Sequence, residues 1–111
     1  MTSYYEPADL KKFAEIGQHA KSLADDFFRY YGSVTATDGA LSKREKALIA
    51  LAVSHAQQCP YCIDAYTTQC LETGANPEQM MEAVHVAAVM QAGITLVHSV
   101  QMQNHLRKLV L

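Results

Sequence analysis

Two helix-start signals constrain the fold of this chain more than any other feature of its sequence. Ser42 and Glu45 form a capping box, in which the two side chains satisfy backbone amides that the first helical turn leaves free. Asn76 and Gln79 repeat the signal, with a capping asparagine followed by a proline and by acidic and amide side chains. The sequence lacks a convincing alternation of apolar and polar residues that would indicate strands. It therefore predicts an all-α protein.

We expect a single domain over residues 1–111, built from about six helices with short breaks between them. The predicted helices start after Pro7 and break at Gly17, continue to Gly32, run from Ser42 toward His55, from Pro60 to near Gly74, from Asn76 to Gly93, and from Ile94 to about Leu106. Pro60 separates the two central helices because proline disfavours helical geometry at Cys59 and has no backbone N–H to donate.

The balance of apolar and charged residues predicts a partner subunit. Hydrophobic residues make up 50% of the chain and charged residues 18%, which is typical of a folded rather than a disordered protein. A domain of this size buries only about two-thirds of its unfolded surface, and few charges are present to cover the rest. We therefore expect a soluble homo-oligomer.

Charge and hydropathy also argue against several classes of partner. The net charge is −2 and the chain has no run of basic residues, so we expect no nucleic acid. Residues 1–7 lack the basic and apolar regions of a signal peptide, which predicts a cytoplasmic location. Glu, His and Gln interrupt the apolar stretches short of the ~20 residues of a membrane span, so we expect no membrane partner.

Three cysteines in a cytoplasmic chain indicate catalysis or metal binding rather than a structural disulfide. Cys59 and Cys62 lie three residues apart, and on a helical turn their Cα atoms would be about 5–6 Å apart, within the range of a disulfide. If Pro60 opens a helix, free amides and the helix dipole stabilise a thiolate there. We interpret the pair as redox-competent, with a zinc half-site and inert core cysteines as the alternatives. Cys70 lies about 12 Å farther along the same helix, so we expect a buried apolar side chain.

A reactive dithiol needs groups that activate one thiol and protonate a leaving group. His55 precedes Cys59 by four residues, and His85 lies on the next predicted helix, so both are candidates for this role. Tyr66 follows Cys62 by four residues and shares its helix face, although a phenol is a poor base at neutral pH. The remaining titratable side chains near these motifs have ordinary explanations in capping, solvation or packing: Glu45, Asp64, His19, His98 and His105.

Two segments resemble the carboxymuconolactone decarboxylase-like, or AhpD-like, superfamily. The apolar run 48–53 followed by Cys59-Pro60-Tyr61-Cys62 is similar to the core of the AhpD-like branch, and residues 81–88 with Gly93 fit the same pattern. The resemblance covers residues 41–97. The amino-terminal part, with the segments 4–7 and 27–32, is similar to a subgroup of arsenosugar biosynthesis-associated peroxidase-like proteins.

The resemblance implies an all-α fold that assembles as trimers or hexamers, and an alkylhydroperoxidase or thiol–disulfide exchange activity. It also implies that Cys62 is the attacking thiol and Cys59 the resolving one, whereas the electrostatic argument favours Cys59. The chain departs from the family's proton relay of one glutamate and two histidines, because Ala47, Tyr61 and Tyr66 occupy the matching positions. Either His55 and His85 replace this relay or the peroxidase activity is weak.

We therefore expect a thiol-dependent peroxidase or thiol–disulfide oxidoreductase, in which a thiolate attacks a hydroperoxide and the partner cysteine closes a disulfide. Its partners would be a hydroperoxide or disulfide substrate and a separate thiol reductant. The alternatives are a protein that binds a soft metal or an arsenical through Cys59 and Cys62, and a catalytically weak oligomeric scaffold. The sequence has no nucleotide or phosphate motif, so we expect no organic cofactor.

Overall fold

The computed structural model describes residues 6–110 and confirms the all-α prediction. Within this range the chain forms one 3₁₀-helix and five α-helices, and no strand. The elements are η1 (Pro7–His19), α1 (Lys21–Thr35), α2 (Lys43–Ala56), α3 (Pro60–Glu72), α4 (Pro77–Val97) and α5 (Ser99–Val110). Tyr4 and Tyr5, which belong to the amino-terminal resemblance, lie outside the described residues.

The capping signals predicted from the sequence are confirmed at α2 and α4. Ser42 Oγ accepts the backbone N–H of Glu45 at 3.0 Å, and the Glu45 carboxylate accepts the backbone N–H of Ser42 at 2.8 Å. Asn76 and Gln79 make the same pair of bonds at 2.8 and 3.0 Å. The hydrogen bonds from Ser42 lower the pKa of Glu45, so this carboxylate serves the helix start, as predicted.

The predicted helix breaks at glycine are wrong at three positions. The helix η1 continues through Gly17, α1 through Gly32 and α4 through Gly93. A glycine inside a helix costs only about 1 kcal/mol relative to alanine, so it weakens a helix without ending it. Gly74 does follow the end of α3 as predicted, with a φ of +93° that residues with a side chain rarely adopt.

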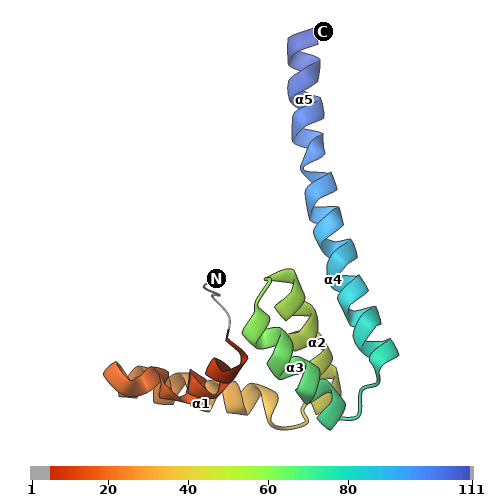
Figure 1. Ribbon diagram of the computed structural model, residues 1–111. Coiled ribbons are helices and arrows are strands. Elements are labelled where there is room, and N and C mark those ends of the chain that lie inside the picture. The colour runs from red at the N-terminus through yellow and green to blue at the C-terminus, as the bar shows by residue number, and fades with distance from the viewer. Residues whose placement is uncertain (1–5, 111) are drawn as a thin grey trace.

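The core lies between α2, α3 and the start of α4, because α2 packs against both of the other helices (Figure 1). Its buried members are Ala47, Leu51, Cys70 and Ala75, and the half-buried side chains packed against them are Leu48, Tyr66 and Met80. Cys70 is completely buried, which confirms its expected place as a small apolar side chain.

An aromatic cluster holds η1 against α1. The Phe13 ring lies 5.2 Å from the Phe28 ring and 6.0 Å from the Phe27 ring between centroids, in edge-to-face arrangements. Gly17 permits this close approach, because a Cβ atom there would lie 2.8 Å from the Cβ of Ala24. From this position η1 also contacts α3, so the amino-terminal helices reach the segment that carries the two cysteines.

The helices α4 and α5 form a rod that runs away from the rest of the chain (Figure 1). Together, Pro77–Val110 are long and apolar enough to cross a membrane by length and composition, and only 6% of the most apolar window is buried. The expectation that polar residues keep every apolar stretch too short is therefore wrong for this segment. The absence of a membrane partner stays a prediction.

Candidate functional site

The turn between α2 and α3 places Cys59 at a helix start. Gln58 adopts a left-handed backbone conformation, with a φ of +54°, and the N–H of Cys59 donates to the carbonyl of Ser54 at 3.0 Å. Cys59 is the N-cap of α3, and Pro60 occupies the first helical position, where its missing N–H costs nothing. The structure thus confirms the predicted helix start at Pro60, with Cys62 in the first turn.

The two sulfur atoms have different environments. Cys59 Sγ accepts the backbone N–H of Cys62 at 3.3 Å, as a capping side chain does. Burial, followed by the hydrogen bond and charge of Cys59, raises the pKa of the Cys62 thiol to about 11. Both thiols are free and half-buried. An N–H at a helix start stabilises negative charge, and Cys59 Sγ is the sulfur that accepts this N–H.

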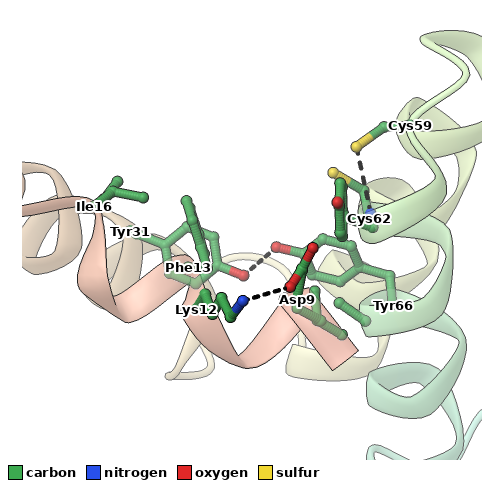
Figure 2. Close-up of a pocket in the computed structure, with 11 residues that line it drawn as sticks. Asp9, Lys12, Phe13, Ile16, Tyr31, Cys59, Cys62 and Tyr66 are labelled. Atoms are coloured by element: carbon green, nitrogen blue, oxygen red, sulfur yellow. Dashed lines mark hydrogen bonds and ion pairs between the residues drawn. The ribbon is translucent and has the colours of Figure 1, made fainter. Parts of the chain in front are cut away.

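An apolar pocket of about 500 Å³ opens beside the two cysteines (Figure 2). One wall comes from η1, and its lining residues are Asp9, Leu10, Lys12, Phe13 and Ile16. The opposite wall comes from the start of α3, and Tyr31 of α1 completes the lining, so this second set is Tyr31, Cys59, Tyr61, Cys62, Ala65 and Tyr66. Lys12 and Asp9 form an ion pair of 2.9 Å, so the charge that each brings to the pocket is balanced by the other.

Two tyrosine hydroxyls meet inside this pocket. Figure 2 shows Tyr31 and Tyr66 pointing toward one another, and their hydroxyl groups share a hydrogen bond. Burial raises the pKa of Tyr66 well above its usual value, and the bond to Tyr31 and the neighbouring Cys62 and Cys59 raise it further. Tyr66 is therefore a neutral phenol at physiological pH, and both sulfurs affect its pKa.

The two predicted histidines stand apart from the pocket lined by the cysteines. The ring Nδ1 of His55 lies 2.9 Å from the carbonyl oxygen of Leu51, and the ring lines a second hollow, between the end of α2 and α4. The helix does not continue from His55 to Cys59, because α2 ends at Ala56. His85 lies exposed on α4, which packs against α2. The described residues thus bring Cys59 and Cys62 together with tyrosines, and their proposed link to either histidine stays a prediction.

Sequence reasoning missed Tyr31 and the wall formed by η1. Tyr66 was identifiable from its spacing of four residues from Cys62, whereas Tyr31 lies 35 residues before Tyr66. The aromatic residues 27–31 were the only available signal, and they do not reveal which helix they contact.

The profile of the carboxymuconolactone decarboxylase family matches residues 22–103, which is most of the chain. The chain belongs to this family. It is 44% identical over 91 residues to "Uncharacterized protein 4 in cox locus" of Paracoccus denitrificans, covering 80% of this chain and 82% of that protein. It is also similar to a crystal structure from Methanobacterium thermoautotrophicum, with a TM-score of 0.72, 29% identity, and coverage of 77% of this chain and 94% of the other.

The structure gives a physical context to the three positions where this member departs from the AhpD-like proton relay. Ala47 is 4% exposed and belongs to the core between α2 and α3, where a carboxylate would be buried among apolar side chains. Tyr61 and Tyr66 both line the pocket beside the cysteines. Two of the three positions are therefore at the site, and both hold phenols in place of imidazoles.

Proposed function

We propose that this member of the carboxymuconolactone decarboxylase family is a thiol-dependent peroxidase that uses Cys59 and Cys62 as its redox pair. One observation carries the proposal: a capping thiol and a second thiol one turn apart face an apolar pocket of about 500 Å³. The family membership supports a peroxidase-like role in general. The apolar and aromatic lining favours a hydroperoxide that carries an apolar group over a small polar one.

The reaction follows from thiol chemistry. The Cys59 thiolate attacks the terminal oxygen of the hydroperoxide, which forms an S–O bond and breaks the O–O bond. The electron pair leaves with the alkoxide, which takes up a proton and departs as an alcohol. The Cys62 thiolate then attacks the sulfenic sulfur of Cys59 and expels hydroxide, which leaves a disulfide. A separate thiol reductant restores the dithiol, and the reducing cytoplasm is the compartment in which we place this cycle.

Cys59 is the attacking sulfur in this proposal, which differs from the order that the AhpD-like resemblance implies. The argument is electrostatic, because the Cys62 N–H supports negative charge on Cys59 Sγ while burial raises the pKa of the Cys62 thiol to about 11. A thiol whose pKa lies so far above 7 is a minor nucleophile at neutral pH until its proton is removed.

A free-thiol count tests the proposal on the reduced protein, with Cys59→Ser and Cys62→Ser variants in parallel. After one equivalent of an organic hydroperoxide, the wild type loses two of its three thiols and retains the buried Cys70. The Cys62→Ser variant accumulates a sulfenic acid that dimedone traps at Cys59, and the Cys59→Ser variant does not. Survival of all three wild-type thiols would contradict the peroxidase activity.

The soft-metal alternative receives no particular support from the described residues. Between residues 6 and 110, no group of three His, Cys, Asp or Glu side chains is placed to hold a metal ion. Two thiolates alone give an incomplete set for most protein metal sites. Metal analysis after purification without chelator is therefore the appropriate companion measurement if the thiols do not react with the hydroperoxide.

A further inference from the structure

Tyr31 and Tyr66 line the pocket and share a hydrogen bond between their hydroxyl groups. The two hydroxyls come from different helices, α1 and α3, and meet at a half-buried position beside both cysteines. An exposed phenol would find water as a partner at no cost. Here each hydroxyl is instead held by the other, so its orientation is fixed by the fold.

The proposed chemistry creates a need for an acid at this position. Cleavage of the O–O bond expels an alkoxide, which is about as strong a base as hydroxide and leaves poorly without a proton. Even with the raised pKa of Tyr66, a phenol is a stronger acid than an alcohol, because bulk water has a pKa of about 15.7. Lys12, another donor in the lining, is held by Asp9, and both predicted histidines lie elsewhere.

We propose that Tyr66 is the general acid that protonates the departing oxygen and that Tyr31 positions it. This assignment rests on the proposed peroxidase function and deepens it. Either hydroxyl can donate in the shared hydrogen bond. In the reactive arrangement Tyr31 donates to the Tyr66 oxygen, and the Tyr66 hydrogen points toward the substrate oxygen. In this arrangement the bond stabilises the phenolate that forms when Tyr66 gives up its proton, whereas the opposite arrangement, in which Tyr66 donates, raises its pKa.

The cycle balances without any further donor inside the pocket. The Cys59 thiolate becomes a sulfenic acid, the alkoxide becomes an alcohol by taking the Tyr66 proton, and Tyr66 becomes a phenolate. The phenolate then takes the proton of the Cys62 thiol. The resulting thiolate attacks the sulfenic sulfur, which forms the S–S bond and breaks the S–O bond, and the expelled hydroxide takes its proton from solvent. Tyr66 ends the cycle as the neutral phenol with which it began.

The order of acidities supports the second proton transfer. The pKa of Cys62 is raised to about 11, and burial together with the charges of the two sulfurs raises that of Tyr66 to a higher value. A phenolate at Tyr66 is therefore the stronger base and removes the Cys62 proton. The position of Tyr66 one helical turn after Cys62 places the two groups on the same face of α3 (Figure 2).

The test uses two peroxides whose leaving groups differ in basicity. tert-Butyl hydroperoxide expels a strongly basic alkoxide, whereas peracetic acid expels acetate, which leaves without a proton. Single-turnover oxidation is followed by stopped flow for the wild type, Tyr66→Phe and Tyr31→Phe. Tyr30→Phe is the matched control, because Tyr30 is 71% exposed and lies outside the pocket lining.

We expect Tyr66→Phe to slow the reaction with tert-butyl hydroperoxide by roughly 100-fold, the usual contribution of a general acid, and to leave the peracetic acid rate unchanged. Tyr31→Phe should cause a smaller loss with the same substrate selectivity, and Tyr30→Phe none. Equal slowing of both peroxides, or no slowing of either, would overturn the role of Tyr66. A wild type that reacts with neither peroxide faster than a free thiol would instead overturn the proposed function.

Discussion

Cys59 and Cys62 are neighbours in space, but their sulfur atoms have different environments. At the start of α3, Cys59 Sγ accepts the backbone N–H of Cys62. The Cys62 thiol is desolvated and hydrogen-bonded to its neighbour, which raises its pKa to about 11. Since the thiolate is the reactive form, this asymmetry is the reason that we propose Cys59 as the attacking sulfur.

The pH dependence of alkylation measures this asymmetry directly. The pKa of Cys62 is raised, so its thiolate is scarce below pH 9, and its rate with iodoacetamide should keep rising about tenfold per pH unit through pH 10. Peptide mapping by mass spectrometry resolves Cys62 from Cys59 and Cys70. A plateau in the Cys62 rate below pH 9 would contradict the assigned environment.

The Cys59→Ala variant separates the two causes that raise the pKa of Cys62: burial, and the hydrogen bond and charge of Cys59. Removal of Cys59 deletes its hydrogen bond and charge, so the pKa of Cys62 should fall from about 11. Burial is the larger cause and persists in the variant, so the pKa should stay above its usual value of 9.0. A midpoint below 9.0 in this variant would show that burial contributes little.

The candidate site was predictable only where its residues are close in sequence. The spacing of Cys59 and Cys62 and the proline between them predict a helix-start dithiol, and the four-residue step to Tyr66 predicts a shared face. Tyr31 could not be predicted, because its contact with Tyr66, 35 positions later in the sequence, depends on how α1 packs in the fold. The role of His55 stays a prediction; the helix that carries it ends at Ala56, and the chain turns at Gln58 before it reaches the cysteines.

The helix starts marked by capping boxes were predictable in this chain, whereas three of the helix breaks predicted at glycines were wrong. A capping box is a local pattern of four residues whose hydrogen bonds form wherever the helix begins, as at Ser42 and Asn76. A glycine makes no hydrogen bond that fixes the end of a helix. It reduces helix stability by about 1 kcal/mol relative to alanine, and packing against a neighbouring helix or a favourable run of residues outweighs this loss. The glycines in η1, α1 and α4 therefore lie inside helices that the sequence pattern divides.

Gly17→Ala and Gly32→Ala should change the free energy of unfolding in opposite directions, because a new Cβ atom meets different surroundings at the two positions. In Gly17→Ala the new Cβ would lie 2.8 Å from the Ala24 Cβ, so η1 must shift from α1 and the free energy of unfolding should fall by about 1–3 kcal/mol. In Gly32→Ala the new Cβ meets nothing within 4 Å, so α1 should gain up to about 1 kcal/mol. Urea unfolding of both variants provides the measurement, and a stabilised Gly17→Ala protein would contradict the packing of η1 on α1.

The chain is extended for its length, because its radius of gyration is 18.9 Å and a compact domain of this size has about 13 Å. The rod formed by α4 and α5 accounts for the extension, and its exposed apolar side chains include Val89, Met90, Ile94, Leu96 and Val97. Exposed apolar surface of this extent requires a cover. We expect that cover to be a second copy of this chain.

Polar residues along the rod favour packing against another protein chain over insertion into lipid. Residues 83–106 contain no Asp, Glu, Lys or Arg, but they include glutamines and histidines such as Gln91, His98, Gln101 and His105. Such side chains are costly in the hydrocarbon of a bilayer, whereas a partner helix can accept their hydrogen bonds. The prediction of a partner subunit rests on the low charge content of the chain. The uncharged residues 83–106 cover most of α4 and the first part of α5.

Light scattering in detergent-free buffer tests this expectation. The wild type should have a mass that is a multiple of 12.3 kDa, and Val89→Lys combined with Ile94→Lys should shift it toward the monomer, because both side chains are more than half exposed. Gln101→Lys adds a charge at an already polar position and is the matched control. A monodisperse wild-type monomer, or a protein that dissolves only with detergent, would contradict a cover formed by a second copy.

We propose that a hydroperoxide oxidises Cys59 and Cys62 as one redox pair. The most direct measurement is mass spectrometry of the non-reduced protein after a single equivalent of tert-butyl hydroperoxide, with peptides mapped around the three cysteines. The account predicts a Cys59–Cys62 disulfide, the loss of two hydrogen atoms from the intact chain and an unmodified Cys70. A dithiol that remains reduced, or a disulfide that involves Cys70, would contradict it.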